Sequence, residues 1–313
     1  MAAHGKLGEA GIPLNPLANL RHQNPVTSIG RGRSMTKGKA RLLWVGMLAF
    51  SSSLVQAQSP QEIIQQVVNT ERTANRNDHS QWMYLDEASK PKEHVLQWVA
   101  GTQQGDVRRV LKKNDQKLTE SQQRELIQKF LRDTKAQNKQ IAENNHDSQQ
   151  VDDLLKLLPA AFLWTQTGAT STTTTLHFDP APNFHPPTRE ARVFSSMTGD
   201  LIADNNQHRI HSMSGHLMRD VTFGGGLLGK LKEGSSFSLA QAQVGQSLWQ
   251  LTAIDVHLQG NALLFKSISL QQAEERSRFE PEPASITLER AADAIMSRPE
   301  VVLLQDKVAY KEN

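Results

Sequence analysis

The first clear pattern of apolar positions is a helical stripe that begins at residue 63. It consists of Ile63, Ile64, Val67 and Val68. Such spacing places apolar side chains on one face of an α-helix. The preceding Ser59-Pro60-Gln61-Glu62 combines an N-cap serine, an early proline and the glutamate of a capping box. The sequence therefore predicts an amphipathic helix over residues 60–74.

Patterns typical of β-strands come next. Trp82 and Tyr84 lie two residues apart, and the β-prone segment 95–99 follows. The segment 101–105 begins and ends with glycine and is typical of a turn. Beyond it, residues 107, 109 and 111 continue with a period of two, which predicts a short antiparallel meander.

A helical pair is predicted over residues 119–160. Thr119 and Gln122 fit a second capping box, and the helix that follows has an apolar stripe made of Leu126, Ile127, Phe130 and Leu131. After a polar run at 144–147, a second helix is expected, with an apolar stripe made of Val151, Leu154, Leu155, Leu157 and Leu158. Pro159 is interpreted as its break. The acids Asp147, Asp152 and Asp153 are interpreted as helix-start residues rather than as a catalytic pair.

From residue 162 to about residue 270 the pattern is strand, turn, strand. A proline-rich connector spans 179–187, and Asp204-Asn205-Asn206 is expected to be a turn. Ile254, Val256 and Leu258 alternate up to Gln259-Gly260-Asn261, which is interpreted as a hairpin turn. A last helix is predicted over 285–296. The fold class is therefore α+β, with a curved antiparallel sheet (a half-barrel) covered by a few helices.

An export signal begins at the internal Met35. The segment from Met35 to Arg41 contains three basic residues, the last of which is Arg41. An apolar run spans 42–50, and Val55-Gln56-Ala57 fits a small-residue cleavage site. These are the parts of a secretory signal peptide. The apolar run is much shorter than the ~20 residues that span a bilayer. We therefore expect cleavage after Ala57 and a periplasmic protein that is not an integral membrane protein.

The predicted cleavage divides the chain into four parts. Residues 1–34 are either a disordered targeting extension or the product of a start codon assigned too early. The signal peptide covers 35–57, the half-barrel domain 58–280, and a C-terminal helix and tail 281–313.

Export also changes the meaning of the charge. Residues 1–57 hold seven of the 35 Lys and Arg residues and one of the 32 Asp and Glu residues, which leaves 28 basic and 31 acidic side chains. The net charge of residues 58–313 is therefore −3, against +3 for the whole chain. Nucleic-acid binding needs clustered cations to neutralise phosphates, so no nucleic-acid partner is expected.

Candidate chemistry is sparse. The chain has no cysteine, which excludes disulfides, thiol catalysis and cysteine-based zinc sites. Gly224–Leu231 approaches a phosphate-binding loop, but Leu231 stands where a Ser or Thr is required, so a hairpin connection or an apolar lid is the better interpretation. His208 and His211 are expected on opposite faces of a strand. No cofactor, no metal site and no enzymatic activity are predicted.

The order of elements resembles the periplasmic lipoprotein carrier family (LolA/LolB-like). It runs from an export signal through a helix, strands and a helical insertion to a long antiparallel segment. The resemblance covers about residues 59–275. The resemblance implies a curved sheet whose helices cover an apolar cavity, and hence a non-catalytic protein that binds a hydrophobic ligand or lipoprotein acyl chains. The candidate cavity residues are Trp164, Trp249, Leu251, Ile254, Phe265 and Phe130.

Two other functions stay open at this point. One is a periplasmic scaffold or sensor module that binds a protein partner through a filled core and an exposed apolar patch. The other is a hydrolase with scattered active-site residues, which a buried acid and base in a cleft would favour. The apolar helix stripes also fit an ordinary filled core.

Overall fold

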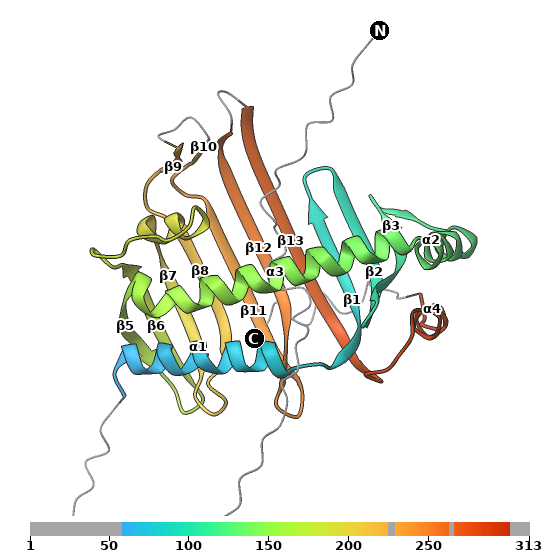
Figure 1. The fold of residues 1–313 in the computed structure, drawn as a ribbon, viewed down its shortest axis with the longest axis horizontal. Coiled ribbons are helices and arrows are strands. Elements are labelled where there is room, and N and C mark those ends of the chain that lie inside the picture. Colours follow the sequence, from blue (N-terminus) through green and yellow to red (C-terminus); the bar gives the residue numbers. More distant parts are fainter. Residues whose placement is uncertain (1–57, 225–228, 263–265, 301–313) are drawn as a thin grey trace, which may run out of the picture.

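The structure is a computed structural model that describes residues 58–224, 229–262 and 266–300. The predicted signal peptide, the segment before it and the end of the C-terminal tail lie outside these residues, as does Phe265. Strands dominate the described part, and a few helices lie across them (Figure 1).

The helical elements differ widely in length. They are α1 (Pro60–Asn77), α2 (Glu120–Arg132), α3 (Thr134–Ala161), the 3-10 helix η1 (Glu190–Ser196) and α4 (Leu288–Met296).

Within the described residues, thirteen strands form one antiparallel sheet. Those before η1 are β1 (Gln81–Lys90), β2 (Glu93–Thr102), β3 (Gly105–Lys113), β4 (Gln116–Lys117), β5 (Phe162–Ala169) and β6 (Thr173–Pro180). Those after it are β7 (Met197–Asp204), β8 (Ile210–Leu217), β9 (Val221–Phe223), β10 (Gly229–Leu231), β11 (Ser236–Gly245), β12 (Leu248–Ala262) and β13 (Lys266–Glu282).

The strand order places the first and the last strands of the described part side by side. It runs β4-β3-β2-β1-β13-β12-β11-β8-β7-β6-β5, with the β9–β10 hairpin attached to β12. The first strand therefore pairs with the last, for example Asp86 opposite Arg276. All pairings are antiparallel, and β4 and β5 form the two edges. The predicted α+β class with a curved antiparallel sheet is confirmed.

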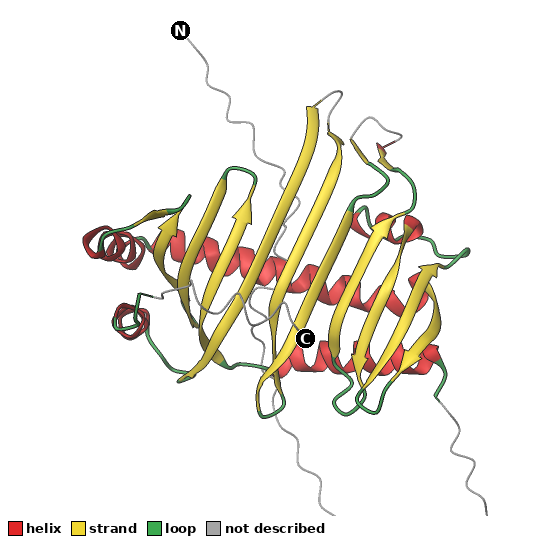
Figure 2. Ribbon diagram, turned by 180° about the vertical axis from the view of Figure 1, so that it is seen from behind, coloured by secondary structure: helices red, strands yellow, loops and turns green. Residues whose placement is uncertain are grey.

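Two helices cover one face of this sheet. In Figure 1, α1 and α3 lie side by side in front of the strands, and Figure 2 shows the strands from the opposite face, with both helices behind them. In contrast, α2 and α4 pack at the end of the sheet that ends in β4: α2 contacts β3, and α4 contacts β2 and β3. Only part of the predicted helical pair at 119–160 therefore covers the same face as α1.

Side-chain alternation in β1 explains why helices occupy both faces at that end. Met83 and Leu85 join a buried cluster with Ile127 of α2 and Ile295 of α4. Trp82 and Tyr84 point to the other face of the strand, because successive side chains alternate. A separate core beneath α1 and α3 combines Ile64, Val67 and Leu158 with aromatic residues of β5, β6 and η1.

Both predicted capping boxes are present. The Glu62 amide donates to the Ser59 hydroxyl at 3.3 Å, and the Ser59 amide donates to the Glu62 carboxylate at 2.8 Å. Thr119 and Gln122 make the equivalent pair of bonds at the start of α2. Each box satisfies amide groups that have no partner within the helix, so these two helix starts follow from local sequence.

The prediction of a separate second helix after residue 147 was wrong. The single helix α3 begins at Thr134, runs through the polar segment 144–147 and ends two residues beyond Pro159. Asp147, Asp152 and Asp153 therefore lie inside the helix and not at its start. Polar residues are tolerated in its middle because helices in proteins are stabilised mainly by packing, and α3 packs at both ends, near β3 and against α1 and β5.

The predicted hairpin turn at 259–261 was also wrong. These residues lie within β12, where Gly260 pairs with both β13 and β10. A Cβ atom on Gly260 would lie 2.2 Å from the carbonyl oxygen of Lys230. The glycine is needed because β10 passes close to it, and not because the chain turns there.

Candidate binding cavity

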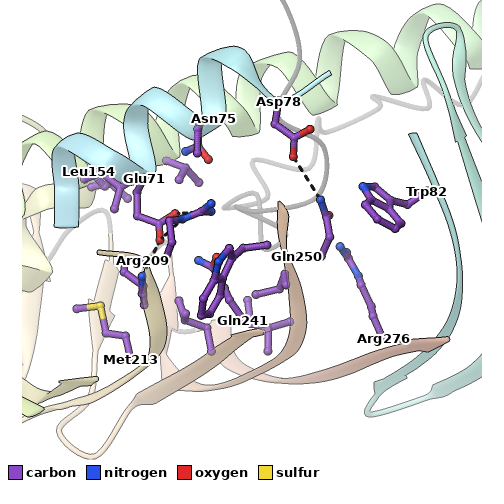
Figure 3. A pocket seen from close by; sticks show the side chains of 18 of the residues that line it. Glu71, Asn75, Asp78, Trp82, Leu154, Arg209, Met213, Gln241, Gln250 and Arg276 are labelled. Carbon is purple, nitrogen blue, oxygen red and sulfur yellow. Dashed lines mark hydrogen bonds and ion pairs between the residues drawn. The ribbon is translucent and has the colours of Figure 1, made fainter. Parts of the chain in front are cut away.

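A cavity of about 300 Å³ lies between the two covering helices and the sheet. Its walls come from α1, α3, η1 and the strands β1, β2, β8, β11, β12 and β13. Figure 3 shows α1 passing over it, with Glu71, Asn75 and Asp78 facing side chains that rise from the strands. The lining combines residues that are far apart in sequence, from Glu71 of α1 to Arg276 of β13.

One part of the lining is apolar. The helix side contributes Val151, Leu154, Leu155 and Leu158. The sheet side contributes Phe237, Leu239, Leu251, Ile254 and Val256. Leu239 lies opposite Ile254, and Phe237 lies opposite Val256 in the β11–β12 ladder. Paired residues of an antiparallel ladder share a face of the sheet, so these strands present a continuous apolar surface to α3.

A register shift brings Leu251 and Ile254 to the same cavity. The pairing jumps from Ala240–Ala253 to Gln241–Leu251, which leaves Thr252 as the extra residue of a β-bulge. Strict alternation would place residues 251 and 254 on opposite faces. The bulge restores both to the cavity face.

The other part of the lining is polar and lies where α1 ends and β1 begins. Asn75, Asp78, Ser80, Gln81 and Gln250 contribute to it. Asp78 accepts hydrogen bonds from the Ser80 amide at 2.8 Å and from the Gln250 side chain at 3.5 Å. The cavity therefore has one apolar and one polar end.

A buried ion pair fixes α1 to the sheet beside this cavity. The Arg209 guanidinium donates to both carboxylate oxygens of Glu71, from Nε at 3.0 Å and from Nη2 at 3.1 Å. The Ile210 amide donates to the same carboxylate at 2.7 Å. Arg209 also lies 5.9 Å from the ring centre of Trp249. The carboxylate and the guanidinium are both held by specific partners, as buried charges require.

A second charged contact joins α1 to α3. Arg72 donates from Nε to Asp152 at 2.8 Å, and Lys156 lies 2.9 Å from the same carboxylate. Burial alone would raise the pKa of Asp152, but the hydrogen bonds from Arg72 and Lys156 outweigh it and lower the pKa to about 2. The two helices thus form one unit over the cavity.

A charged cluster borders the cavity on β13 and β1. Arg276, which lines the cavity, donates from Nε to Glu274 at 2.6 Å and lies 5.2 Å from the ring centre of Tyr84. Asp86 accepts a hydrogen bond from Gln97 at 2.8 Å. Burial, together with the nearby Glu274 charge, raises the pKa of Asp86 to about 6. Burial also raises the pKa of Tyr84.

Three of the predicted cavity residues line the cavity, namely Trp249, Leu251 and Ile254. Trp164 does not: it packs in the aromatic core with Phe162 and Phe178, and its indole donates to the Leu158 carbonyl at 3.2 Å. Nor does Phe130, which packs at the α2 end, because its helix lies against β3. Phe265 lies outside the described residues.

Sequence reasoning missed the contribution of α1 and of the start of β1. Glu71, Gln81, Trp82 and Arg209 line the cavity, and none was a candidate. The sequence did contain a signal for Glu71. This residue lies one helical turn beyond Val67 and Val68, so a glutamate occupies a position that continues their apolar stripe. The arginine that pairs with it lies 138 residues away in sequence, and no local pattern identifies it.

The segment Gly224–Leu231, which approaches a phosphate-binding motif in sequence, belongs to the β9–β10 hairpin. Phe223 of β9 pairs with Gly229 of β10, and Lys230 forms an ion pair with Asp220. This agrees with the hairpin interpretation; residues 225–228 lie outside the described part. The expectation that His208 lies on a strand was wrong: this residue lies in the connection between β7 and β8, with a φ of 51°. Within residues 58–300, leaving out the two gaps, no group of three or more His, Asp or Glu side chains is arranged to hold a metal ion.

Among the helices that the structure describes, none is both long and apolar enough to cross a membrane. No family model matches the chain, and searches of the curated proteins and of the solved structures found no match either.

Proposed function

We propose that this protein binds the apolar chain of an acyl ligand in the cavity between α1, α3 and the sheet. The observation that carries the proposal is the cavity itself, about 300 Å³ in volume with an apolar part formed by α3, β11 and β12. This volume lies at the lower end of the roughly 300–1,000 Å³ typical of ligand pockets. It is also about twice the roughly 150 Å³ of an apolar cavity that stays dry and binds benzene.

The energetics favour such a ligand. Each buried methylene group contributes about 0.8 kcal/mol, so a chain of modest length offsets the loss of its own freedom on binding. The resemblance to lipoprotein carriers, with their helix-covered cavities, supports the same ligand class.

The proposed role is non-catalytic. The two acids that line the cavity are Glu71 and Asp78, and both are engaged in hydrogen bonds to neighbouring groups. This arrangement supports binding rather than general acid–base chemistry. A protein scaffold is less well supported, because the large apolar side chains exposed in the described residues are only Leu126, Leu163 and Met218. They belong to α2, to β5 and to the connection after β8.

Binding can be tested with a fluorescent fatty acid and the delipidated protein. We expect micromolar affinity for the unaltered chain. Leu251→Asp places a charge in the cavity and is expected to weaken binding at least tenfold, whereas Lys232→Ala, at an exposed position, is expected to leave it unchanged. Leu154→Trp fills the cavity from the helix side and is expected to weaken binding without adding a charge.

Circular dichroism of each variant must show a folded protein. Absence of binding by the unaltered, folded chain at tens of micromolar would overturn the proposal and leave the scaffold function in its place. Equal binding by the Leu251 and Lys232 variants would overturn the assignment of the cavity.

The site of action that we propose is the periplasm, with the signal peptide removed. The support is the sequence pattern from Met35 to Ala57. The expected mature N-terminus is Gln58, directly before the Ser59 cap of α1. N-terminal sequencing of the protein from the cell envelope tests this, and a stable product that still begins before Leu42 would contradict it.

A further inference from the structure

The polar end of the cavity contains a buried amide without a hydrogen-bond partner. Gln81, the first residue of β1, is 1% exposed and lines the cavity. Neither its side-chain nitrogen nor its oxygen has a hydrogen-bond partner within the described residues. Leaving a buried polar group unsatisfied costs about 1–3 kcal/mol, so such a group requires an explanation.

The neighbouring backbone accommodates this side chain closely. A Cβ atom on Gly101 would lie 3.2 Å from the Gln81 side-chain oxygen and 3.5 Å from the Trp82 carbonyl oxygen. The glycine of β2 therefore leaves the space that the amide occupies. Gln81 is held against the wall of the cavity, with one acceptor and two donor positions unused.

The charges around the polar end are already paired. Glu71 and Arg209 neutralise each other through two hydrogen bonds. Arg276 is bound to Glu274, and Asp78 adds a negative charge to the lining. Within the described residues, the lining therefore offers no cation that is left to neutralise an anionic headgroup. A free carboxylate there would lose its hydration without gaining a counterion.

We infer that the Gln81 end of the cavity binds the headgroup of the acyl ligand, and that this headgroup is uncharged and both donates and accepts hydrogen bonds, as an amide does. The inference rests on the proposed function, because the apolar end must hold the chain for the headgroup to reach Gln81. A carboxamide headgroup offers a donor and an acceptor that match those of Gln81. A site built for hydrogen bonds discriminates strongly against ligands that cannot make them.

The test compares decanamide with decanoate, which have the same chain and differ in the headgroup. Both compete with a fluorescent acyl probe at pH 8, where decanoate is ionised. We expect the unaltered protein to bind decanamide at least about tenfold more tightly than decanoate. Gln81→Leu keeps a similar volume and removes the amide, so it is expected to reduce this ratio to about one through weaker binding of decanamide.

The matched control is Gln104→Leu, at an exposed position in the β2–β3 turn, which is expected to leave the ratio unchanged. The ratio measured on the unaltered chain tests the inference even if the Gln81 variant does not fold. Equal affinities for the two ligands, with binding still abolished by Leu251→Asp, would overturn the headgroup assignment and leave chain binding intact. Failure of both ligands and of the probe to bind would instead overturn the proposed function.

Discussion

The contact between Glu71 and Arg209 gives the sharpest test of how the cavity is closed. Glu71→Ala removes a carboxylate that is 3% exposed and accepts three hydrogen bonds, two from Arg209 and one from the Ile210 amide. The substitution leaves a guanidinium charge and a backbone amide buried without their acceptor. It also detaches the middle of α1 from β8.

The expected loss follows from this burial. Breaking a buried ion pair by removing one partner costs about 3–5 kcal/mol, because the remaining charge stays out of water. Replacing both partners with apolar residues of similar volume avoids that cost. The double variant Glu71→Leu with Arg209→Met leaves no unpaired charge, but the Ile210 amide still lacks its acceptor. It is therefore expected to lose only about 1–3 kcal/mol, less than Glu71→Ala alone.

Urea unfolding followed by circular dichroism measures these free energies of unfolding. Glu120→Ala is the control, because its partner Arg124 is exposed and such surface pairs contribute less than about 1 kcal/mol. Hydrogen exchange of α1 amides shows whether the helix is released locally. A loss below 1 kcal/mol for Glu71→Ala, with unchanged exchange in α1, would refute the argument that this pair closes the cavity.

Three further predictions concern other parts of the structure. Burial and an acidic neighbour raise the pKa of Asp86 to about 6. Between pH 4 and 6 the folded state therefore holds a proton that the unfolded state has lost, and the free energy of unfolding falls as the pH rises. Asp86→Asn is expected to flatten this slope in pH-dependent unfolding and to stabilise the protein at pH 7 by up to about 3 kcal/mol. Gly199→Ala places a Cβ atom 2.0 Å from a carbonyl oxygen of β8 and is expected to lower the melting temperature strongly. Gly168→Ala is the control, because its Cβ atom would lie 3.6 Å from the nearest side chain and should leave the melting temperature unchanged. Similar melting temperatures for the two variants would contradict the β7–β8 geometry. A brominated acyl chain is expected to quench the emission of Trp249, which lines the cavity, and not that of Trp98, which lies in the cluster beneath α2 and α4. Because the chain has five tryptophans, the signals are separated with variants that keep either Trp249 or Trp98 as their single tryptophan. Equal quenching in the two variants would place the acyl chain elsewhere.

Local patterns determined the parts of the fold that were predicted correctly. The capping boxes at Ser59 and Thr119 act within four residues of the chain, so the sequence predicts them well. The alternation of Trp82 and Tyr84 likewise indicates a strand without knowledge of its partner. These features depend on neighbours in sequence, which is why they could be predicted.

The site was predicted only in part, because its remaining residues depend on distant contacts. The polar segment inside α3 looked like a boundary, yet packing at both ends keeps the helix continuous. Gly260 looked like a turn residue, but its role is set by β10. Trp164 has the large apolar side chain expected of a cavity residue, and only the three-dimensional packing places it in the core.

The pairing of β1 with β13 determines the order in which this molecule can assemble. The strands β1 to β3 and the strands from β5 to β12 can each pair within their own segment of the chain, and contacts between residues near in sequence form fast. The seam between the two groups closes only when β13, the last strand, is available. Until then β1 presents an unpaired edge, which favours association with other chains. Gln81, Trp82 and Arg276 lie on this seam, so the polar end of the cavity is completed last. A chain shortened before β13 lacks Arg276 and leaves Gln81 and Trp82 at an unpaired sheet edge.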